Sequence, residues 1–242
     1  MRKLKIPTNL TSLAYKSIKD YILEGRLDED SRLTEEFLSS QLGISKSPIR
    51  EALNRLEAQG LIRIEARRGA YLRTFSNKEI GDLYDVREAL ELHAVRTGVF
   101  PAARIKELRA GTKRLRGLLK ANEKARYIEE DVNFHAALAR ATGNMRLCEV
   151  LENIQNQIWL FRRKTYDLSS SGAPDAHDAV IDALEKGDRP AAEAAMSRHI
   201  SEVRNRLLEH LTQAEEQKPA AKTTPRKLAL AIVPQASDLG TE

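Results

Sequence analysis

The chain lacks two features that would point to a secreted or membrane-bound protein. Only one of its 242 residues is a cysteine, Cys148, which excludes an intrachain disulfide, a cysteine metal cluster and a CxxC redox pair. No apolar run approaches the ~20 residues that a membrane-spanning helix needs, and the opening segment MRKLKIPTNL lacks the apolar stretch of a signal peptide. We therefore expect a cytoplasmic protein that does not contact a membrane. Beside Leu147, Val150 and Leu151, Cys148 is predicted to be a small core residue rather than a reactive thiol.

Excess charge of one sign is also scarce, and the small surplus is concentrated in the first third of the chain. The formal net charge is +5. Residues 1–75 contain 14 Lys and Arg against 10 Asp and Glu, whereas residues 76–214 contain 22 against 21. Such a distribution is expected if the first part faces phosphate groups and the second part has another task. The length and the 41% hydrophobic content suffice for two domains.

Residues 34–73 have the pattern of a helix, a tight turn, a second helix and a β-hairpin. Thr34 is a suitable N-cap for a first helix that ends just before Gly43, and this glycine can adopt the positive φ that a sharp turn needs. Ser47 and Pro48 predict the start of the second helix, because serine caps a helix and proline in the next position gives up no helical hydrogen bond. This order of elements is typical of a winged helix-turn-helix.

The second helix has an apolar face and a polar face. The apolar face can pack on the first helix and consists of Ile49, Ala52, Leu53 and Leu56. The residues able to point outward are Lys46, Ser47, Arg50 and Asn54. Arg50 lies in the first turn, where helix-turn-helix proteins present side chains to base edges, and a bidentate arginine is the commonest partner of guanine. Arg50 is therefore our first candidate for reading a base.

Gly60 ends the second helix, and a hairpin with a basic tip follows. Residues 61–65 and 70–74 carry the pattern of two strands. The tip between them suits contact with phosphate or with the minor groove, and it consists of Arg67, Arg68 and Gly69. In the alternative interpretation the segment is an ordinary helical hairpin and β-ribbon whose charges are solvated. The agreement of cap, turn, apolar stripe and basic tip favours the DNA-binding interpretation.

The pattern becomes helical from Ser76 on, after a basic arm at residues 1–9 and the winged helix-turn-helix, which together span residues 1–75. Ser76 and Glu79 have the spacing of a capping box. Apolar positions with a helical period predict six helices, at residues 80–99, 102–121, 127–141, 145–166, 177–184 and 190–211. They predict an all-α bundle over residues 76–214. Residues 215–242 are rich in Lys, Pro, Ala and Thr and are predicted to be a disordered tail, with an unassigned apolar patch at residues 228–233.

Three of the five histidines join an aspartate in a pattern that metal sites use. Asp131 and His135 are four residues apart and so lie on one face of a helix. His177 is placed at the start of another helix and His199 within the last. One carboxylate and three imidazoles from three helices could converge on a divalent transition metal. The spacing alone leaves a second interpretation open, in which these histidines are hydrogen-bonded core residues.

Three segments of the first part resemble the GntR family of bacterial transcription regulators: YKSIKDYILEGRLDEDSRL at residues 15–33, LGISKSPIREALNRLEAQGLI, and RRGAYL in the wing. The resemblance implies that a helix over residues 15–23 buries Ile18, Ile22 and Leu23 against the motif. It also implies DNA contacts from the second helix and the wing, at Ser45, Lys46, Ser47, Arg50, Arg67, Arg68 and Gly69.

Three further segments resemble the FCD ligand-binding domain of the FadR-like branch of this family: DxxxHxxLARATGN at 131–144, HDAVIDALEKGD at 177–188 and AAMSRH at 194–199. The resemblance implies a divalent transition metal, with zinc as the first candidate and nickel or manganese as alternatives. The positions that match the ligands of the metal-binding members are Asp131, His135, His177 and His199. Ala176 departs from the acidic residue often found there, which puts in doubt a residue that would orient a ligand rather than a ligand itself.

The remaining histidines are not expected to join this group. His210 lies eleven residues past His199, roughly 16 Å further along the same helix, and so cannot share a metal. His93 shares a helix with Arg87 and Glu91, which are four apart and could simply pair on the surface. In the family, however, an arginine of the VREALE segment faces the effector cavity. Arg87 is therefore a candidate clamp for an effector carboxylate.

Together the two parts predict a transcription regulator that binds double-stranded operator DNA and responds to a small organic acid. The acid would coordinate open positions on the metal, and we expect it to release a repressor from its operator. We also expect a homodimer, because two heads that read two half-sites bind more tightly than one.

Two rival functions were weighed against this prediction. The first is a metal-dependent hydrolase or isomerase that the first domain tethers to DNA, since such metal sites can activate water. Spacing places no additional carboxylate beside the four ligands, however, because Glu129 and Glu130 point along other faces. The second is a DNA-bending protein, which would need a stronger positive charge and would leave the histidines unexplained.

Overall fold

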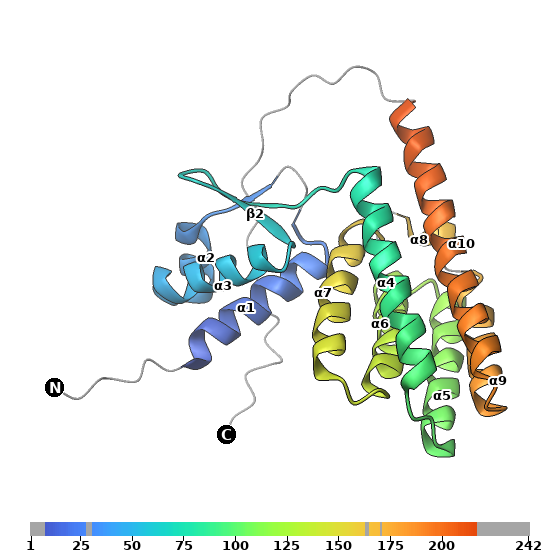
Figure 1. Ribbon diagram of the computed structural model, residues 1–242. Coiled ribbons are helices and arrows are strands. Elements are labelled where there is room, and N and C mark those ends of the chain that lie inside the picture. The colour runs from blue at the N-terminus through green and yellow to red at the C-terminus, as the bar shows by residue number, and fades with distance from the viewer. Residues whose placement is uncertain (1–7, 28–30, 163–164, 170, 217–242) are drawn as a thin grey trace. The chain divides into compact units, whose positions relative to one another are not determined.

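Figure 1 shows the computed structural model, which describes residues 8–27, 31–162, 165–169 and 171–216. These residues form two compact units that divide between Thr74 and Phe75. The first unit combines helices with a small sheet, and the second is helical throughout its described residues. The predicted fold class, a winged helix-turn-helix followed by an all-α bundle, is confirmed. No helix in the described part of the chain is long and apolar enough to cross a bilayer.

The first unit is built around α3 (Lys46–Ala58), which packs against α1 (Thr8–Leu23) and α2 (Glu35–Leu42). The predicted apolar face of α3 is buried, at Ile49, Ala52, Leu53 and Leu56. The predicted turn is also present. The Thr34 hydroxyl accepts a hydrogen bond from the Phe37 amide at 3.1 Å, and Gly43 has a φ of 64°. The helical spacing of the apolar residues therefore determines which face of α3 is buried.

Helix α3 begins earlier than predicted. Its N-cap is Ser45 rather than Ser47, and Pro48 is the third helical residue. The first-turn amides of a helix have no partner within the helix, so a proline is tolerated anywhere in that turn. The proline therefore does not identify which of two neighbouring serines is the cap.

The sheet contains one strand more than the predicted hairpin. The antiparallel order is β1 (Arg32–Leu33), β3 (Gly69–Leu72) and β2 (Ile62–Glu65). β1 escaped prediction because two residues are too few to show an alternating pattern. At the tip, Arg67 has a φ of 62°. Gly69 has a φ of 111°, and a Cβ there would lie 2.6 Å from the Leu33 carbonyl oxygen, so only glycine fits beside β1.

Helix α1 is longer than predicted. It begins at Thr8, so residues 8 and 9 belong to a helix rather than to an arm, and residues 1–7 lie outside the described residues. Ile18 and Ile22 are buried as predicted, but Leu23 is only half-buried. Ala14 and Tyr21 of α1 are buried as well, and so is Leu27, which follows the helix.

The described residues of the second unit form six long helices, as predicted, and one short helix. Their bounds are α4 (Asn77–Thr97), α5 (Ala102–Lys120), α6 (Lys124–Arg140), α7 (Met145–Arg162), α8 (Tyr166–Ser169), α9 (Ala173–Glu185) and α10 (Arg189–Glu216). The capping box of Ser76 and Glu79 opens α4 as predicted. The predicted continuation of α7 to residue 166 is wrong, because α7 ends at Arg162 and Tyr166 begins α8. Residues 215 and 216, the first two of the predicted disordered tail, are helical and belong to α10, and the rest of the tail, including its apolar patch, lies outside the described residues.

Helix α9 begins at Ala173, four residues before the predicted start at His177. Pro174 lies in its first turn, where proline is tolerated, so His177 lies one turn inside the helix rather than at its start. Around this region one apolar cluster joins residues of α6, α9 and α10, including Leu138, Val180 and Met196. Leu138, Val180 and Met196 each lie three residues from a histidine of the predicted metal site, His135, His177 and His199 respectively. These histidines therefore have apolar neighbours on their own helices.

Cys148 packs on the edge of a smaller apolar cluster that contains Leu147 and Leu151. It is half-buried rather than fully buried, and Val150 is exposed. Cys148, which was predicted to be a core residue, therefore lies at the periphery of the core.

Candidate metal centre and nucleic-acid interface

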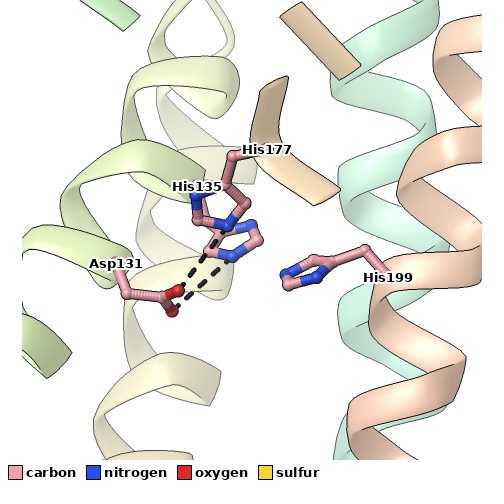
Figure 2. A group of neighbouring side chains, drawn as sticks. All are labelled: Asp131, His135, His177 and His199. Atoms are coloured by element: carbon pink, nitrogen blue, oxygen red, sulfur yellow. Dashed lines mark ion pairs between the residues drawn. The ribbon is translucent and has the colours of Figure 1, made fainter. Parts of the chain in front are cut away.

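Three helices bring four ligating side chains together in the second unit, and Figure 2 shows them pointing toward one another. Asp131 and His135 lie one turn apart on α6, His177 lies on α9 and His199 on α10. One potential ligand atom of each residue lies within 4.8 Å of those of the other three. Helical periodicity placed two of these residues together, and the packing of α9 and α10 brings in the other two.

All four side chains are removed from water. Asp131, His135 and His177 are 0% exposed and His199 is 5% exposed. The His177 Nε2 lies 3.6 Å from Asp131 Oδ1, and the His135 Nε2 lies 3.7 Å from Asp131 Oδ2. These distances are too long for hydrogen bonds. They are short enough for the atoms to share a central ion.

Several buried atoms of this group have no hydrogen-bond partner among the described residues: Asp131 Oδ1, His135 Nε2, and both ring nitrogens of His177. Leaving a buried polar atom unpaired costs about 1–3 kcal/mol, so such atoms are rare and seldom gather at one point. The interpretation as hydrogen-bonded core histidines does not fit His177, whose ring stacks on Phe134 at 3.8 Å between centroids. A divalent cation fits the donor set.

Glu91 of α4 orients one of these imidazoles. The Nδ1 of His135 donates a hydrogen bond to Glu91 Oε2, so the lone pair of Nε2 faces the other three residues. The carboxylate also accepts from Arg87 Nε at 2.7 Å. Burial opposes ionisation of Glu91, but Arg87 and His135 outweigh it and lower its pKa to about 2. Glu91 is therefore an ionised acceptor at neutral pH.

Arg162, at the end of α7, holds the aspartate. Its Nη1 donates to Asp131 Oδ2, and both side chains are buried. Burial alone would raise the pKa of Asp131, but Arg162, followed by His135 and His177, lowers it well below its usual range. The carboxylate is thus charged, and its Oδ1 remains directed toward His177.

His177 and His199 are neutral because burial outweighs the effect of nearby charges. Burial lowers the pKa of His177 and of His199 well below the usual value, because it penalises the imidazolium form. A neutral imidazole offers a lone pair, which is the form that a metal requires. The burial that keeps water away therefore also prepares these rings as ligands.

Glu91 and Arg162 were missed by sequence reasoning, and two of our expectations about this region are wrong. Arg87 and Glu91 do pair, but inside the protein rather than on the surface. A carboxylate also does lie beside the four candidate ligands, although Glu91 is already engaged on both oxygens. A signal was present in the apolar stripe of α4, which runs at spacings of four, three, four and four through Ile80, Tyr84, Arg87, Glu91 and Val95. Charged residues on such a stripe are predicted to be buried.

A small pocket lies beside this group in the second unit, with a cavity volume of ≈ 10 Å³, about the space of one water molecule. Its walls include two buried cations, Arg87 and Arg162, and the Gln155 side chain, whose Nε2 has no partner among the described residues. The remaining lining residues are apolar or aromatic: Ile128, Val132, Ile158 and Trp159. His93 and His210 are exposed and lie outside the group, as expected.

The candidate nucleic-acid interface lies in the first unit. The predicted contact residues of α3 and its cap are exposed: Ser45, Lys46, Ser47 and Arg50. Asn54, which was predicted to be able to point outward, is exposed as well. At the tip between β2 and β3, Arg67 and Arg68 are exposed and Gly69 is half-buried. Two cations of α3 have acidic partners on α2: Arg50 pairs with Glu35, and Lys46 pairs with Glu36.

Comparisons with known proteins agree with both halves of this description. Residues 10–72 match the sequence profile of the bacterial regulatory proteins of the gntR family, and residues 82–202 match that of the FCD domain. YdhC of Bacillus subtilis, an HTH-type transcriptional regulator, is 28% identical over 221 residues, 89% of this chain and 96% of that protein. The gluconate operon transcriptional repressor of Bacillus licheniformis is 27% identical over 200 residues, 77% and 80% of the two chains.

The fold is also that of solved regulators. A GntR transcriptional regulator from Rhodococcus sp. RHA1 superposes with a TM-score of 0.74 at 22% identity, covering 84% of this chain and 99% of that one. These relatives are named as regulators of transcription. The rival interpretation as a metal-dependent hydrolase or isomerase receives no support from them.

Proposed function

The chain belongs to the GntR family of bacterial regulatory proteins and carries an FCD domain, and on this premise we propose a repressor that a small organic acid releases from its operator. Membership of this family makes the chain a DNA-binding transcription regulator rather than an enzyme. The observation that carries the finer proposal is the convergence of four buried ligating residues beside a cavity lined by two arginines. A sensor of an anion is the function that this arrangement supports best.

We assign the metal ligands to Asp131, His135, His177 and His199. Three imidazoles and one carboxylate suit a divalent transition ion, with zinc first and nickel or manganese as alternatives. A bound ion would act as a Lewis acid for a carboxylate oxygen of the effector. Glu91 orients His135 and so positions one of the four ligands.

The cavity residues give the effector its chemical class. Two buried guanidinium groups favour an anion, and we assign to Arg87 the clamp on its carboxylate. Each is balanced by a carboxylate, Glu91 and Asp131 respectively, so that a divalent ion would leave the site with a net positive charge. The relative named for a gluconate operon is consistent with an organic acid.

The DNA contacts are assigned to the first unit. We propose that Arg50 reads a base edge, and that the remaining contacts come from Ser45, Lys46, Ser47, Arg67, Arg68 and Gly69. A homodimer would place two such heads on two half-sites. The effector can change the affinity for DNA only if it binds one arrangement of the heads more tightly than another. Sedimentation of the intact chain should therefore give a species of twice the 27.2 kDa chain mass.

Elemental analysis of the purified chain tests the metal assignment. We expect about one divalent transition ion per chain, and His177→Ala should lose most of it, because removing one of four protein ligands weakens a site strongly. Glu91→Gln should weaken metal binding by about 10- to 100-fold, since it disturbs the orientation of a ligand. His210→Ala is the matched control and should keep the full content. Equal metal content in all four proteins would refute the assignment.

A DNA-release assay tests the effector class. Labelled duplex selected from a random pool by the intact chain should be released by members of a panel of sugar acids, hydroxy acids and dicarboxylates. The corresponding uncharged amides, in which no carboxylate remains, should have no effect. Release by the amides, or by no acid in a metal-loaded preparation, would count against an organic-acid sensor.

A further inference from the structure

Arg50 and Glu35 form a two-pronged ion pair between α3 and α2, within the first unit. The Nε of Arg50 donates to Glu35 Oε1 at 2.8 Å, and its Nη2 donates to Oε2 at 2.7 Å. The arginine side chain is 62% exposed and the glutamate side chain 28% exposed. The hydrogen bond to Arg50 lowers the pKa of Glu35, so the carboxylate is ionised at neutral pH. The pair therefore lies on the surface but has a fixed geometry.

The geometry of this pair leaves one edge of the guanidinium available. An arginine has five N–H donors, and the fork with Glu35 occupies the Nε and Nη2 edge. The other edge, formed by Nη1 and the second Nη2 hydrogen, makes no hydrogen bond to any residue that the structure describes. Two parallel N–H donors on one edge are the arrangement that matches the O6 and N7 acceptors of guanine.

We infer that Glu35 is a positioning residue that holds Arg50 for reading a guanine, an inference that rests on the proposed DNA contact of Arg50. An unrestrained arginine is flexible enough to turn toward a phosphate, which carries no sequence information. Fixing one edge reduces the conformational freedom lost on binding and aims the other edge at a base. Glu35 should thus contribute to discrimination between bases while its negative charge opposes binding to DNA in general.

The neighbouring pair of Lys46 and Glu36 supplies a natural control. Lys46 Nζ contacts Glu36 through one oxygen at 2.5 Å, and the two side chains are 50% and 71% exposed. An ammonium group is a point charge without a fork, so Glu36 cannot fix a second edge. Both glutamates lie in the first turn of α2. Replacing either glutamate by glutamine removes one negative charge from the first turn of α2. Only the replacement of Glu35 releases Arg50 from its ion pair.

The test compares Glu35→Gln, Glu36→Gln and Arg50→Ala in the intact chain. A random duplex pool is selected with the unsubstituted chain, and the base preference at each position of the preferred duplex is then measured for every variant. Preference is a ratio of affinities within one preparation, so a partly folded sample does not alter it. Arg50→Ala identifies the position that this residue reads.

At that position we expect Glu35→Gln to reduce the preference for G·C by about fivefold, as part of the discrimination that a bidentate pair provides. Preferences at other positions should be unchanged, and binding to scrambled duplex should tighten by about twofold because a negative charge is lost. Glu36→Gln should tighten binding to scrambled duplex similarly and leave every preference unchanged.

Two outcomes would overturn parts of this reasoning separately. If Arg50→Ala weakens no position selectively, the proposed reading helix is wrong. If Arg50→Ala does so but Glu35→Gln changes the preference no more than Glu36→Gln, Glu35 is only a nearby charge and the positioning role is refuted.

Discussion

The two units use the same kind of ion pair in opposite settings. In the first unit Arg50 and Glu35 meet at a surface, where water competes with the pair and its net stabilisation is about 0–1 kcal/mol. In the second unit Arg162 and Asp131 are buried, and removing one partner of such a pair typically costs about 3–5 kcal/mol. An exposed pair leaves the second edge of its arginine open to a nucleic acid. A buried pair instead fixes the position of a carboxylate that we propose as a metal ligand.

The largest expected effect concerns that buried pair. Arg162→Met should destabilise the metal-free chain by about 3 kcal/mol or more, because it leaves the Asp131 carboxylate buried without its cation. Arg50→Met should change stability by less than about 1 kcal/mol. Urea unfolding of both variants, in the presence of a chelator, provides the measurement. Equal losses of unfolding free energy in the two variants would contradict the proposed difference between the buried and the exposed ion pair.

The next effect concerns DNA. Arg50→Ala should lower the preference for one base at one position of each half-site, by about 1–3 kcal/mol. Arg67→Ala should weaken binding to all duplexes more evenly, because the wing tip is assigned to the backbone or the minor groove. Fluorescence anisotropy with the preferred and scrambled duplexes distinguishes them. An unchanged affinity ratio in Arg50→Ala would show that another residue reads the base.

The smallest effect is a dependence of stability on pH that arises from the second unit. In the metal-free fold, burial lowers the pKa of His177 and His199 below the ordinary value of 6.5, so the unfolded chain takes up their protons first as the pH falls. The stability gained by keeping them neutral is complete above pH 6.5 and is lost progressively below it. Thermal unfolding across this range should show less acid sensitivity in His177→Gln. The exposed-site control His93→Gln should behave like the unsubstituted chain.

The contrast between the units also explains how far the sequence could be interpreted. The turn at Gly43, the apolar face of α3 and the spacing of Asp131 and His135 are local features, and each follows from helical geometry within one segment. The roles of Glu91 and Arg162 depend on which helices pack together. Their partners lie 44 and 31 residues away along the chain, so no local pattern identifies the contact.

Smaller departures have local causes. Ser45 and Ser47 are both acceptable caps, and only the full first turn of α3 decides between them. The two residues of β1 gain their strand conformation from pairing with β3 rather than from a pattern of their own. In both places the sequence permits more than one local structure, and contacts with neighbouring elements select among them.

The central claim is that the metal group serves the response to the effector and not the binding of DNA. The direct measurement is affinity for the selected duplex, with and without an effective organic acid, before and after removal of the metal by a chelator. The account predicts that metal-free protein binds the duplex nearly as tightly as before but is no longer released by the acid, and that restoring the ion restores release. Metal-free protein that is still fully released by the acid would contradict the claim.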